Sequence, residues 1–298
     1  MKKNEKLGVS LLLAAIIFLS IARVPISAAK INITKEELRY FETIKDKNIY
    51  NYPSVSLYLG DTYINEKAYL INDTTYVPLR AVTTLAGADV QFESNTRTAM
   101  IKMKGLDMTV SDGSYIIDAN GRAIMSKTPA VILSDGRMYA PVRSIAKALS
   151  LDVMWLPTRE VKLSGDIIPL ESAESFYDYS ELYWLSRIIS AESRGEPILG
   201  QICVGNVVLN RVRHKDYPNT IYGVIFDRKY GVQFSPIIDG SIYAEPTYNA
   251  VLSAKICLEG FLISDDIMFF MEPSKSTSSW IYISRPYAFT VANHYFFN

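Results

Sequence analysis

The stretch YWLSRIISAESRGEP, residues 183–197, predicts the end of a buried helix whose apolar face carries an acid. Three apolar residues and the acid stand at i, i+3, i+4 and i+7 on one side of an α-helix: Leu185, Ile188, Ile189 and Glu192. Burying an unpartnered carboxylate is costly or raises its pKa. Glu192 is therefore either paired with a neighbouring arginine, such as Arg187 or Arg194, or placed there for chemistry.

The chain around this stretch keeps a helical pattern, so the second half is expected to be mainly helical. Gly195 and Pro197 signal the end of one helix and the start of the next, and Ser180 is expected to cap the first. Helices are predicted at 181–193, 198–214 and 245–260, with a short helix within 217–227, a polar and aromatic loop at 232–243, and extended segments at 265–272 and 287–297.

The first half contains an internal repeat. TYVPLRAVTTLAGADVQF, residues 75–92, aligns with MYAPVRSIAKALSLDVMW, residues 138–155, at a constant offset of 63. Each copy predicts a strand, a proline at a helix start, a helix of about ten residues and a further strand. Between the copies, Asp112-Gly113 and Asn120-Gly121 are typical of hairpin turns. Residues from about 54 to 165 are therefore expected to form an α+β unit.

The repeated motifs YVPLRAV and YAPVRSI, each followed by a helix and then ADVQF or LDVMW, resemble the copper amine oxidase N-terminal-like domain of secreted bacterial proteins. The resemblance covers most of 54–165 and implies a non-catalytic accessory module, a stalk or wall-associated spacer. No oxidase activity is implied, because the histidine ligands and the length of an amine oxidase are lacking. Arg80 and Arg143, which repeat two residues after a proline, are expected to tie each helix to a neighbouring loop.

The N-terminus has the pattern of an export signal. Residues 1–29 combine a basic start, MKKNEK, an apolar run of about sixteen residues, LGVSLLLAAIIFLSIA, and small residues before Lys30. The alternative, an uncleaved anchor helix, is less favoured because a spanning helix needs roughly twenty apolar residues. The mature protein is expected to be exported, secreted or associated with the wall or spore envelope, and not to be an integral membrane protein.

The composition argues against several classes of function. The chain has 31 basic and 31 acidic side chains; without residues 1–29, 27 basic and 30 acidic remain, a net charge of −3 with no basic footprint for nucleic acid. His214 and His294 are the only histidines, so no metal site or cofactor is expected. Cys203 and Cys257 allow one disulfide, although two buried free thiols fit at least as well.

The second half has the composition of a saccharide site. A helix end presents one acid, and nearby loops are rich in Gln, Ser, Asn, Tyr and Trp. Aromatic faces bind sugar rings, and amides and hydroxyls bind sugar OH groups. A carboxyl in a partly apolar site stays protonated near neutrality and can serve as the general acid that glycosidic cleavage needs.

Five motifs in order strengthen this interpretation: AESRGEP, GQICVGNVVLNRV, YPNTIYGVIF, QFS and SSWIYISRPYAFTVANHYFF. From about 183 to 298 they resemble the cell wall hydrolase family of the spore-cortex-lytic enzyme SleB. The resemblance implies a lysozyme-like, transglycosylase-type fold that cuts the β-1,4 bond between N-acetylmuramic acid and N-acetylglucosamine and leaves a 1,6-anhydro end. It also implies that Glu192 is the catalytic glutamate. Ser193, where the family usually has Ala, and a longer segment before Gln233 depart from the pattern.

The expected fold class is α+β, with a duplicated β-hairpin–helix–strand domain before a mainly helical, lysozyme-like lytic transglycosylase domain. The segments are a signal peptide at 1–29, a linker or short helix at 30–53, the accessory domain at 54–165, a linker at 166–179 and the cell wall hydrolase domain at 180–298. The peptidoglycan-binding module common in the family's spore enzymes is replaced by the repeat domain.

Candidate substrate-binding residues are Gln233 and Ser235 for sugar hydroxyls, Tyr230, Phe234 and Trp280 for ring contacts, and Asn206 as the helix residue expected to reach the cleft. Ordinary packing is the alternative for each of them. Glu196 is expected to be structural, and His294 to be a satisfied core histidine rather than a catalyst. Asn210 and Arg211 are expected to form interhelical hydrogen bonds.

The sequence thus predicts an exported lytic transglycosylase whose partner is the peptidoglycan glycan strand. Glu192 protonates the leaving oxygen and then, as carboxylate, takes the proton of the substrate's C6 hydroxyl, so no second carboxylate is needed. Two alternatives stay open: a muramidase that produces reducing ends, and a non-catalytic wall-binding or structural protein. Spore cortex, cut during germination, and vegetative wall both stay open as substrates.

Overall fold

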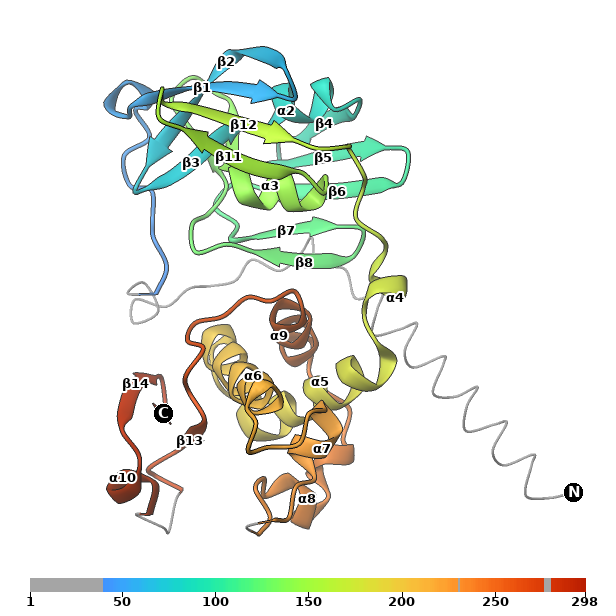
Figure 1. The fold of residues 1–298 in the computed structure, drawn as a ribbon, viewed down its shortest axis with the longest axis vertical. Helices are drawn as coiled ribbons and strands as arrows, with labels where there is room; N and C mark the ends of the chain where they lie inside the picture. Colours follow the sequence, from blue (N-terminus) through green and yellow to red (C-terminus); the bar gives the residue numbers. More distant parts are fainter. Residues whose placement is uncertain (1–39, 230, 276–279) are drawn as a thin grey trace, which may run out of the picture. The chain divides into compact units, whose positions relative to one another are not determined.

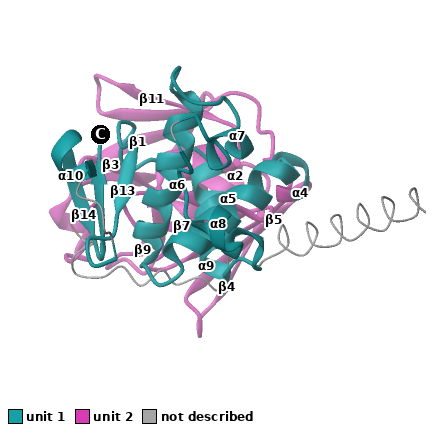
Figure 2. Cartoon of the chain, turned by 90° about the horizontal axis from the view of Figure 1, so that it is seen from below, with its two compact units in different colours: residues 1–24, 33–37, 174–298 teal, residues 25–32, 38–173 magenta. Residues whose placement is uncertain are grey.

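The structure is a computed structural model that describes residues 40–229, 231–275 and 280–298. The described chain divides into two compact units, residues 40–173 and residues 174–298 (Figure 1; Figure 2). The signal peptide expected at 1–29, residues 30–39 of the segment at 30–53, and Tyr230 lie outside the described residues. Within the described ranges, every helix is too short or too polar to span a lipid bilayer.

The first unit is rich in β-structure, and the second is mainly helical, which confirms the mixed α+β fold class. The described strands of the first unit form a seven-stranded sheet in the order β11-β12-β1-β2-β3-β10-β9 and a five-stranded sheet in the order β4-β5-β6-β7-β8. They are β1 Ser54–Leu59, β2 Thr62–Ile71, β3 Thr74–Pro78, β4 Asp89–Glu93, β5 Thr98–Met103, β6 Leu106–Ser111, β7 Ile116–Ala119, β8 Arg122–Met125, β9 Val131–Ile132, β10 Met138–Pro141, β11 Asp152–Leu156 and β12 Glu160–Ser164.

The two copies of the repeat meet where β3 pairs with β10. Val77 lies opposite its equivalent Ala140, and on either side Tyr76 lies opposite Pro141 and Pro78 opposite Tyr139, so the two copies pair antiparallel about this central position. Each strand leads into a helix of seven residues, α2 Leu79–Leu85 and α3 Val142–Ala148. These helices are shorter than the predicted ten residues because each ends within about two turns in a bend toward the next strand.

Turn chemistry sets the register of the hairpins, as predicted. Asn120 and Gly121 join β7 to β8 with φ of 54° and 78°, the left-handed conformation of both central residues that a two-residue hairpin turn requires. Gly113, in the turn between β6 and β7, has φ of 81°. Both dipeptides identified in the sequence therefore lie at strand reversals.

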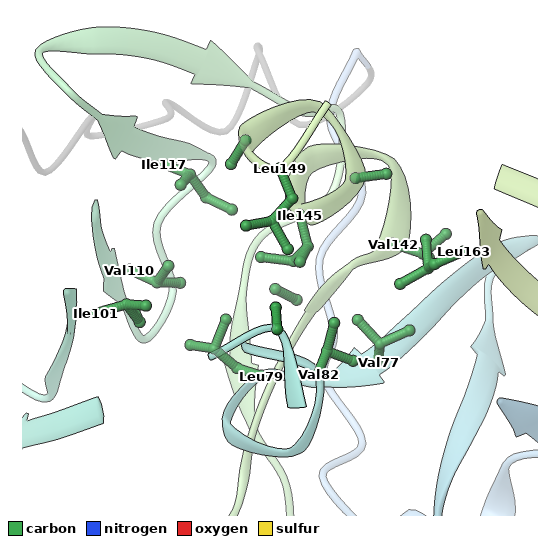
Figure 3. Close-up of a cluster of buried hydrophobic side chains, with 14 of the residues drawn as sticks. Val77, Leu79, Val82, Ile101, Val110, Ile117, Val142, Ile145, Leu149 and Leu163 are labelled. Carbon is green, nitrogen blue, oxygen red and sulfur yellow. The ribbon is translucent and has the colours of Figure 1, made fainter. Parts of the chain in front are cut away.

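The core of the first unit lies where α2 and α3 meet both sheets (Figure 3). Leu79 and Val82 of α2 and Ile145 of α3 are at most 1% exposed and belong to one cluster with residues of the five-stranded sheet, such as Ile101. On the outer side of α2, Arg80 Nη1 donates to the Val90 carbonyl at 3.0 Å. Arg80 therefore ties α2 to the strand β4, where a tie to a loop was expected.

The second unit is built on three long helices, α5, α6 and α9, which pack on one another. Its described elements are α4 Ala173–Phe176 at the junction, α5 Tyr179–Ser193, α6 Ile198–Arg213, α7 Ile221–Ile225, α8 Pro236–Asp239, η3 Ser241–Tyr243, α9 Tyr248–Leu258 and α10 Trp280–Ser284, with a sheet of β13 Phe269–Met271, β15 His294–Phe297 and β14 Tyr287–Val291. The predicted helices and extended segments are confirmed.

Three local expectations are corrected. Asp178, not Ser180, caps α5, because its side chain accepts a hydrogen bond from the Glu181 amide at 3.0 Å. The expected linker at 166–179 contains the helix α4, and the expected loop at 232–243 contains α8 and η3. Short helical turns of this length give too few residues for a periodic pattern to show in the sequence.

The two cysteines are buried free thiols, so the disulfide alternative is excluded. Cys257 of α9 lies against α6, and its Sγ donates to the Ile202 carbonyl at 3.5 Å. Gly205 of α6 is the point of closest approach, since an added Cβ would lie 2.7 Å from the Cys257 sulfur and 3.0 Å from Ile189 Cδ1 of α5. The close packing of the three long helices therefore requires a residue without a side chain at position 205.

Gly205→Ala is expected to lower the free energy of unfolding by about 1–2 kcal/mol. The methyl overpacks the helix crossing, and this cost exceeds the gain in helix propensity that alanine brings. Denaturant unfolding measures the difference. Gly195→Ala is the matched control, because a Cβ there meets no atom of the described residues within 4 Å. Equal stability of both variants would contradict close packing at Gly205.

Candidate active site

Glu192 lies in the last turn of α5, one turn beyond the apolar residues that precede it on the same side. Leu185, Ile188 and Ile189 are fully buried, as predicted from their spacing. Glu192 itself is partly exposed. The buried face of α5 therefore ends in a carboxyl group that solvent, or a substrate, can still reach.

The arginines considered as partners are both engaged elsewhere. Arg187 Nη2 forms a salt bridge with Glu245 Oε1 at 3.0 Å, and Arg194 Nε donates to the Ser190 carbonyl at 3.3 Å. In the part of the chain that the structure describes, no hydrogen bond or salt bridge involves Glu192. The interpretation of Glu192 as half of a structural ion pair therefore loses its support.

The surroundings of Glu192 favour its protonated form. The pKa of Glu192 is raised from 4.5 to about 7, mainly by burial and to a smaller extent by the negative charge of Asp239. Asp239 ends α8, which packs against α5. The Asp239 carboxylate accepts a hydrogen bond from the Ser241 amide at 2.8 Å, which lowers its own pKa. Near neutral pH, Asp239 is therefore ionised while about half of Glu192 carries its proton.

Asp239 could not be predicted as part of the site. It lies far from Glu192 in the chain, in a segment expected to be a loop, and no pattern in the sequence joins the two carboxyl groups. The only available signal was the acid itself, in a segment rich in polar and aromatic residues. Packing of α8 and η3 against α5 creates the pair.

An aromatic cluster also lies along α5 and was missed. The Trp184 ring contacts the rings of Tyr222, Phe226 and Tyr243, with centroids at 5.4, 5.1 and 6.3 Å. Tyr222 and Tyr243 remain 51% and 60% exposed. Large aromatic rings that keep one face open to water are suited to stacking on the apolar face of a sugar. Trp184 stands within the helical pattern of α5, so nothing in the sequence marked it as part of an aromatic cluster.

Two predicted substrate contacts are buried, which corrects their interpretation. Phe234 is 2% exposed, and the Arg211 guanidinium lies over its ring at 5.3 Å. Asn206 is fully buried. Its Nδ2 donates to the Phe261 carbonyl at 3.1 Å, and its Oδ1 accepts from the Ile263 amide at 2.9 Å. Both side chains therefore have structural partners and do not reach the surface.

The polar side chains of α6 hold the chain that follows α9. One turn after Asn206, Asn210 Nδ2 donates to the carbonyls of Ser264 and Ile267 at 3.2 and 3.0 Å. Arg211 Nε donates to the Met268 carbonyl at 2.8 Å. The expected hydrogen bonds thus exist, but their acceptors lie in the segment 264–268 rather than in another helix.

The other candidates are accessible or lie outside the described residues. Gln233 is partly exposed, and its Nε2 donates to the Gly231 carbonyl at 3.1 Å. Ser235 is exposed and directly precedes α8, the helix that carries Asp239. Trp280 is 52% exposed and contacts the ring of Phe269 in the three-stranded sheet at 6.1 Å. Of the predicted residues, Ser235 is therefore the one that the fold joins to the surroundings of Glu192.

Glu196 and His294 form a buried polar cluster. Glu196 accepts hydrogen bonds from the Asn293 amide at 3.1 Å and from Asn293 Nδ2 at 2.9 Å. This ties the α5–α6 junction to the β14–β15 turn, a structural role as expected. His294 Nδ1 lies 3.7 Å from Glu196 Oε2, which is within salt-bridge distance when the ring is protonated, but it has no hydrogen-bond partner among the described residues. Burial lowers the pKa of His294. His294 is therefore a core histidine, as expected, although its Nδ1 lacks the hydrogen bond expected of a satisfied ring.

The chemistry available at this site is proton transfer. Among residues 40–229, 231–275 and 280–298, the side chains of His, Cys, Asp and Glu form no group of three or more that could hold a metal ion. A single carboxyl with a pKa near neutrality can donate a proton in one step and accept one in the next. The exposed rings of Tyr222 and Tyr243, which contact Trp184 of the same helix, offer a surface for a carbohydrate.

Two families match the chain, one in each unit. Residues 59–163 match the copper amine oxidase N-terminal domain, and residues 195–297 match the cell wall hydrolase family. The second match begins just after Glu192, so the role of this residue depends on the geometry described above.

Curated relatives resemble the second unit. The spore cortex-lytic enzyme of Bacillus cereus is 33% identical over 120 residues, which cover 40% of this chain and 45% of that enzyme. The enzyme of the same name from Bacillus subtilis is 30% identical over 120 residues, 40% of this chain and 38% of that enzyme. The chain therefore spans less than half the length of these relatives.

Among solved structures, the catalytic domain of the germination-specific lytic transglycosylase SleB from Bacillus anthracis is 33% identical. The match covers 41% of this chain and 97% of that chain, with a TM-score of 0.37. Together with the two family matches, the curated relatives identify the domains of the chain. It carries a copper amine oxidase N-terminal domain at residues 59–163 and a cell wall hydrolase domain, homologous to the SleB spore cortex-lytic enzymes, at residues 195–297.

Proposed function

We propose that this protein is an exported lytic transglycosylase that cuts the β-1,4 bond between N-acetylmuramic acid and N-acetylglucosamine in peptidoglycan, with Glu192 as its single general acid/base. The observation that carries the proposal is the unpaired Glu192 carboxyl at the end of α5, whose pKa is raised to about 7. The names of the relatives support peptidoglycan as the substrate class, with spore cortex as one of its forms. The proposed catalytic domain is 180–298, with 54–165 as an accessory domain.

The proposed reaction needs one carboxyl group. Protonated Glu192 donates its proton to the leaving glycosidic oxygen as the bond from that oxygen to C1 of the muramic acid breaks. The resulting Glu192 carboxylate then takes the proton of the C6 hydroxyl of the same sugar while the C6 oxygen bonds to C1. The products are a 1,6-anhydro end and a free 4-hydroxyl, and Glu192 is protonated again. No water is consumed.

The proposed binding surface combines the accessible predicted residues with the aromatic cluster. Tyr222 and Tyr243 present open ring faces beside α5, and Ser235 and Gln233 offer a hydroxyl and an amide close in sequence to α8. Sugar rings stack on the first pair and hydrogen-bond to the second. The N-terminal apolar run supports export, and N-terminal sequencing of the protein recovered outside the cell tests whether it is removed.

Digestion of purified spore cortex and purified vegetative wall, with mass spectrometry of the products, tests the proposed reaction. Anhydromuramic ends are expected from at least one of the two substrates. Reducing ends would replace transglycosylation by hydrolysis. Retention of the protein on insoluble wall with no release of fragments would instead favour a wall-binding protein.

Asp239→Asn is expected to move the alkaline limb of the pH–rate profile to lower pH. The Asp239 charge raises the pKa of Glu192, so its removal lowers that pKa, and less of the general acid is protonated at neutrality. Burial is the larger cause and remains, so the rate at pH 7 is expected to fall only about two- to fivefold. Asp227→Asn, an aspartate of the second unit that does not affect the pKa of Glu192, is the control. An unchanged profile for Asp239→Asn would remove Asp239 from the site.

A further inference from the structure

The first unit contains a cavity of about 1120 Å³ that the proposed reaction does not use. Its walls come from β2, α2, β4, β5 and the β9–β10 hairpin, all within residues 40–173. Ligand pockets for small molecules have volumes of roughly 300–1,000 Å³, so the cavity is large enough for a ligand of several linked rings or residues.

The cavity has an apolar floor and an aromatic rim. Ile64, Leu79 and Val90 line it and are each at most 8% exposed, so their side chains form the base. Tyr63 and Phe92 also line it but are 43% and 42% exposed. An enclosed apolar base with exposed rings above it suits a ligand that carries both small apolar groups and flat ring faces.

The charges around the cavity favour an anion. Three lining residues are arginines, Arg80, Arg97 and Arg137, against one lining acid, Glu66. Arg97 and Arg137 each pair with an aspartate outside the lining.

Arg80 is the most available of these cations. It uses one N–H to hold the Val90 carbonyl, and it has no acidic partner in the described part of the chain. Its guanidinium keeps further donors for a carboxylate.

The internal repeat places counterparts of two lining residues outside this cavity. Phe92 and Arg80 correspond to Trp155 and Arg143 at the offset of 63. Trp155 is similarly exposed, at 48%. Neither counterpart is among the residues that line this cavity. The chain itself therefore supplies matched control positions.

We propose that this cavity binds peptide-bearing peptidoglycan fragments, with Phe92 and Tyr63 against a sugar ring, the apolar floor against the alanine methyl groups of the stem peptide, and Arg80 on a peptide carboxylate. Two other wall ligands fit the cavity less well. A neutral oligosaccharide has no negative charge to pair with Arg80, and a polyol phosphate polymer has no apolar groups to contact the floor. The proposal rests on the proposed function in that the ligand comes from the same polymer. It makes the first unit a wall-binding module for the catalytic domain.

Titration calorimetry of the full chain with a soluble disaccharide–tetrapeptide tests this proposal. The fragment, N-acetylglucosamine linked to N-acetylmuramic acid, lacks the bond that the proposed reaction cuts, so it is not consumed. Phe92→Ala and Arg80→Gln are each expected to raise Kd about tenfold. The repeat counterparts Trp155→Ala and Arg143→Gln are expected to stay within about twofold of the parent.

Three outcomes would overturn the cavity assignment. They are the absence of binding at millimolar ligand, equal Kd values for Phe92→Ala and Trp155→Ala, and equally tight binding of neutral N-acetylglucosamine oligomers. Phe92 is exposed, so Phe92→Ala keeps the test valid even where Arg80→Gln disturbs the contact with Val90.

Wall digestion by the same variants separates this proposal from the proposed function. If the parent cleaves wall but its affinity for the fragment is insensitive to Phe92, only the cavity assignment falls. If binding depends on Phe92 but no wall is cleaved, only the catalytic assignment falls.

Discussion

Glu192→Gln is expected to abolish the release of fragments from purified peptidoglycan, with a fall in kcat of roughly 10³-fold or more. The amide keeps the shape of the side chain but cannot donate an acidic proton to the leaving oxygen. It also cannot accept the proton of the C6 hydroxyl in the second step. Because the proposed mechanism uses one carboxyl for both steps, no other group replaces it. The decrease in turbidity of a wall suspension and the yield of anhydro products measure the effect.

The variant is expected to fold at least as well as the parent. Burial raises the pKa of Glu192 from 4.5 to about 7, so the folded state holds the proton more tightly than the unfolded state. The parent therefore loses stability as the pH rises from about 4.5 to 7, while the glutamine variant does not. The difference in melting temperature between Glu192→Gln and the parent is therefore expected to increase, in favour of the variant, as the pH rises through this range.

Glu181→Gln is the matched control for the loss of a carboxyl group. Glu181 lies in the first turn of the same helix and is exposed, so its amide variant is expected to release fragments at the parent rate. Fragment release by Glu192→Gln at the rate of Glu181→Gln would show that Glu192 is not the general acid. Loss of activity in both variants would point to a requirement for the charge of α5 rather than for one proton.

Local patterns in the sequence predicted the elements that carry the site. The spacing of Leu185, Ile188 and Ile189 identified the buried face of α5, and the repeat identified the two strand–helix units of the first domain. These signals succeed because helix faces and turn residues depend on neighbours within a few positions. The position of Glu192 at the end of that face followed from the same spacing.

The partners of the polar side chains could not be predicted, because they come from distant parts of the chain. Glu196 is held by Asn293, 97 residues away, and Asn206 by the Phe261 carbonyl, 55 residues away. Asp239 reaches the surroundings of Glu192 only through the packing of α8 on α5. A polar residue in a helix therefore gave no sign of whether it faced a substrate or the backbone of another segment. The lysozyme-like arrangement of the second unit stays a prediction.

Asn206→Ala separates these two roles. The substitution removes the hydrogen bonds that the buried Asn206 side chain makes with the Phe261 carbonyl and the Ile263 amide. Since the loss of such a hydrogen bond inside a protein costs about 1–3 kcal/mol, the free energy of unfolding is expected to fall by about 3 kcal/mol. Denaturant unfolding measures the loss. Asn219→Ala removes the same amide from an exposed position and is expected to change stability by less than about 0.5 kcal/mol.

The kinetics of the Asn206 variant complete the test. Because Asn206 is buried and holds the segment that follows α9, the variant is expected to cleave peptidoglycan with the parent KM at temperatures where it remains folded. A raised KM with unchanged stability would instead mean that the side chain binds substrate, as the sequence first indicated. Stability and KM change independently. Hydrogen bonds that hold the backbone affect the folded fraction, whereas a contact with substrate affects the occupancy of the site.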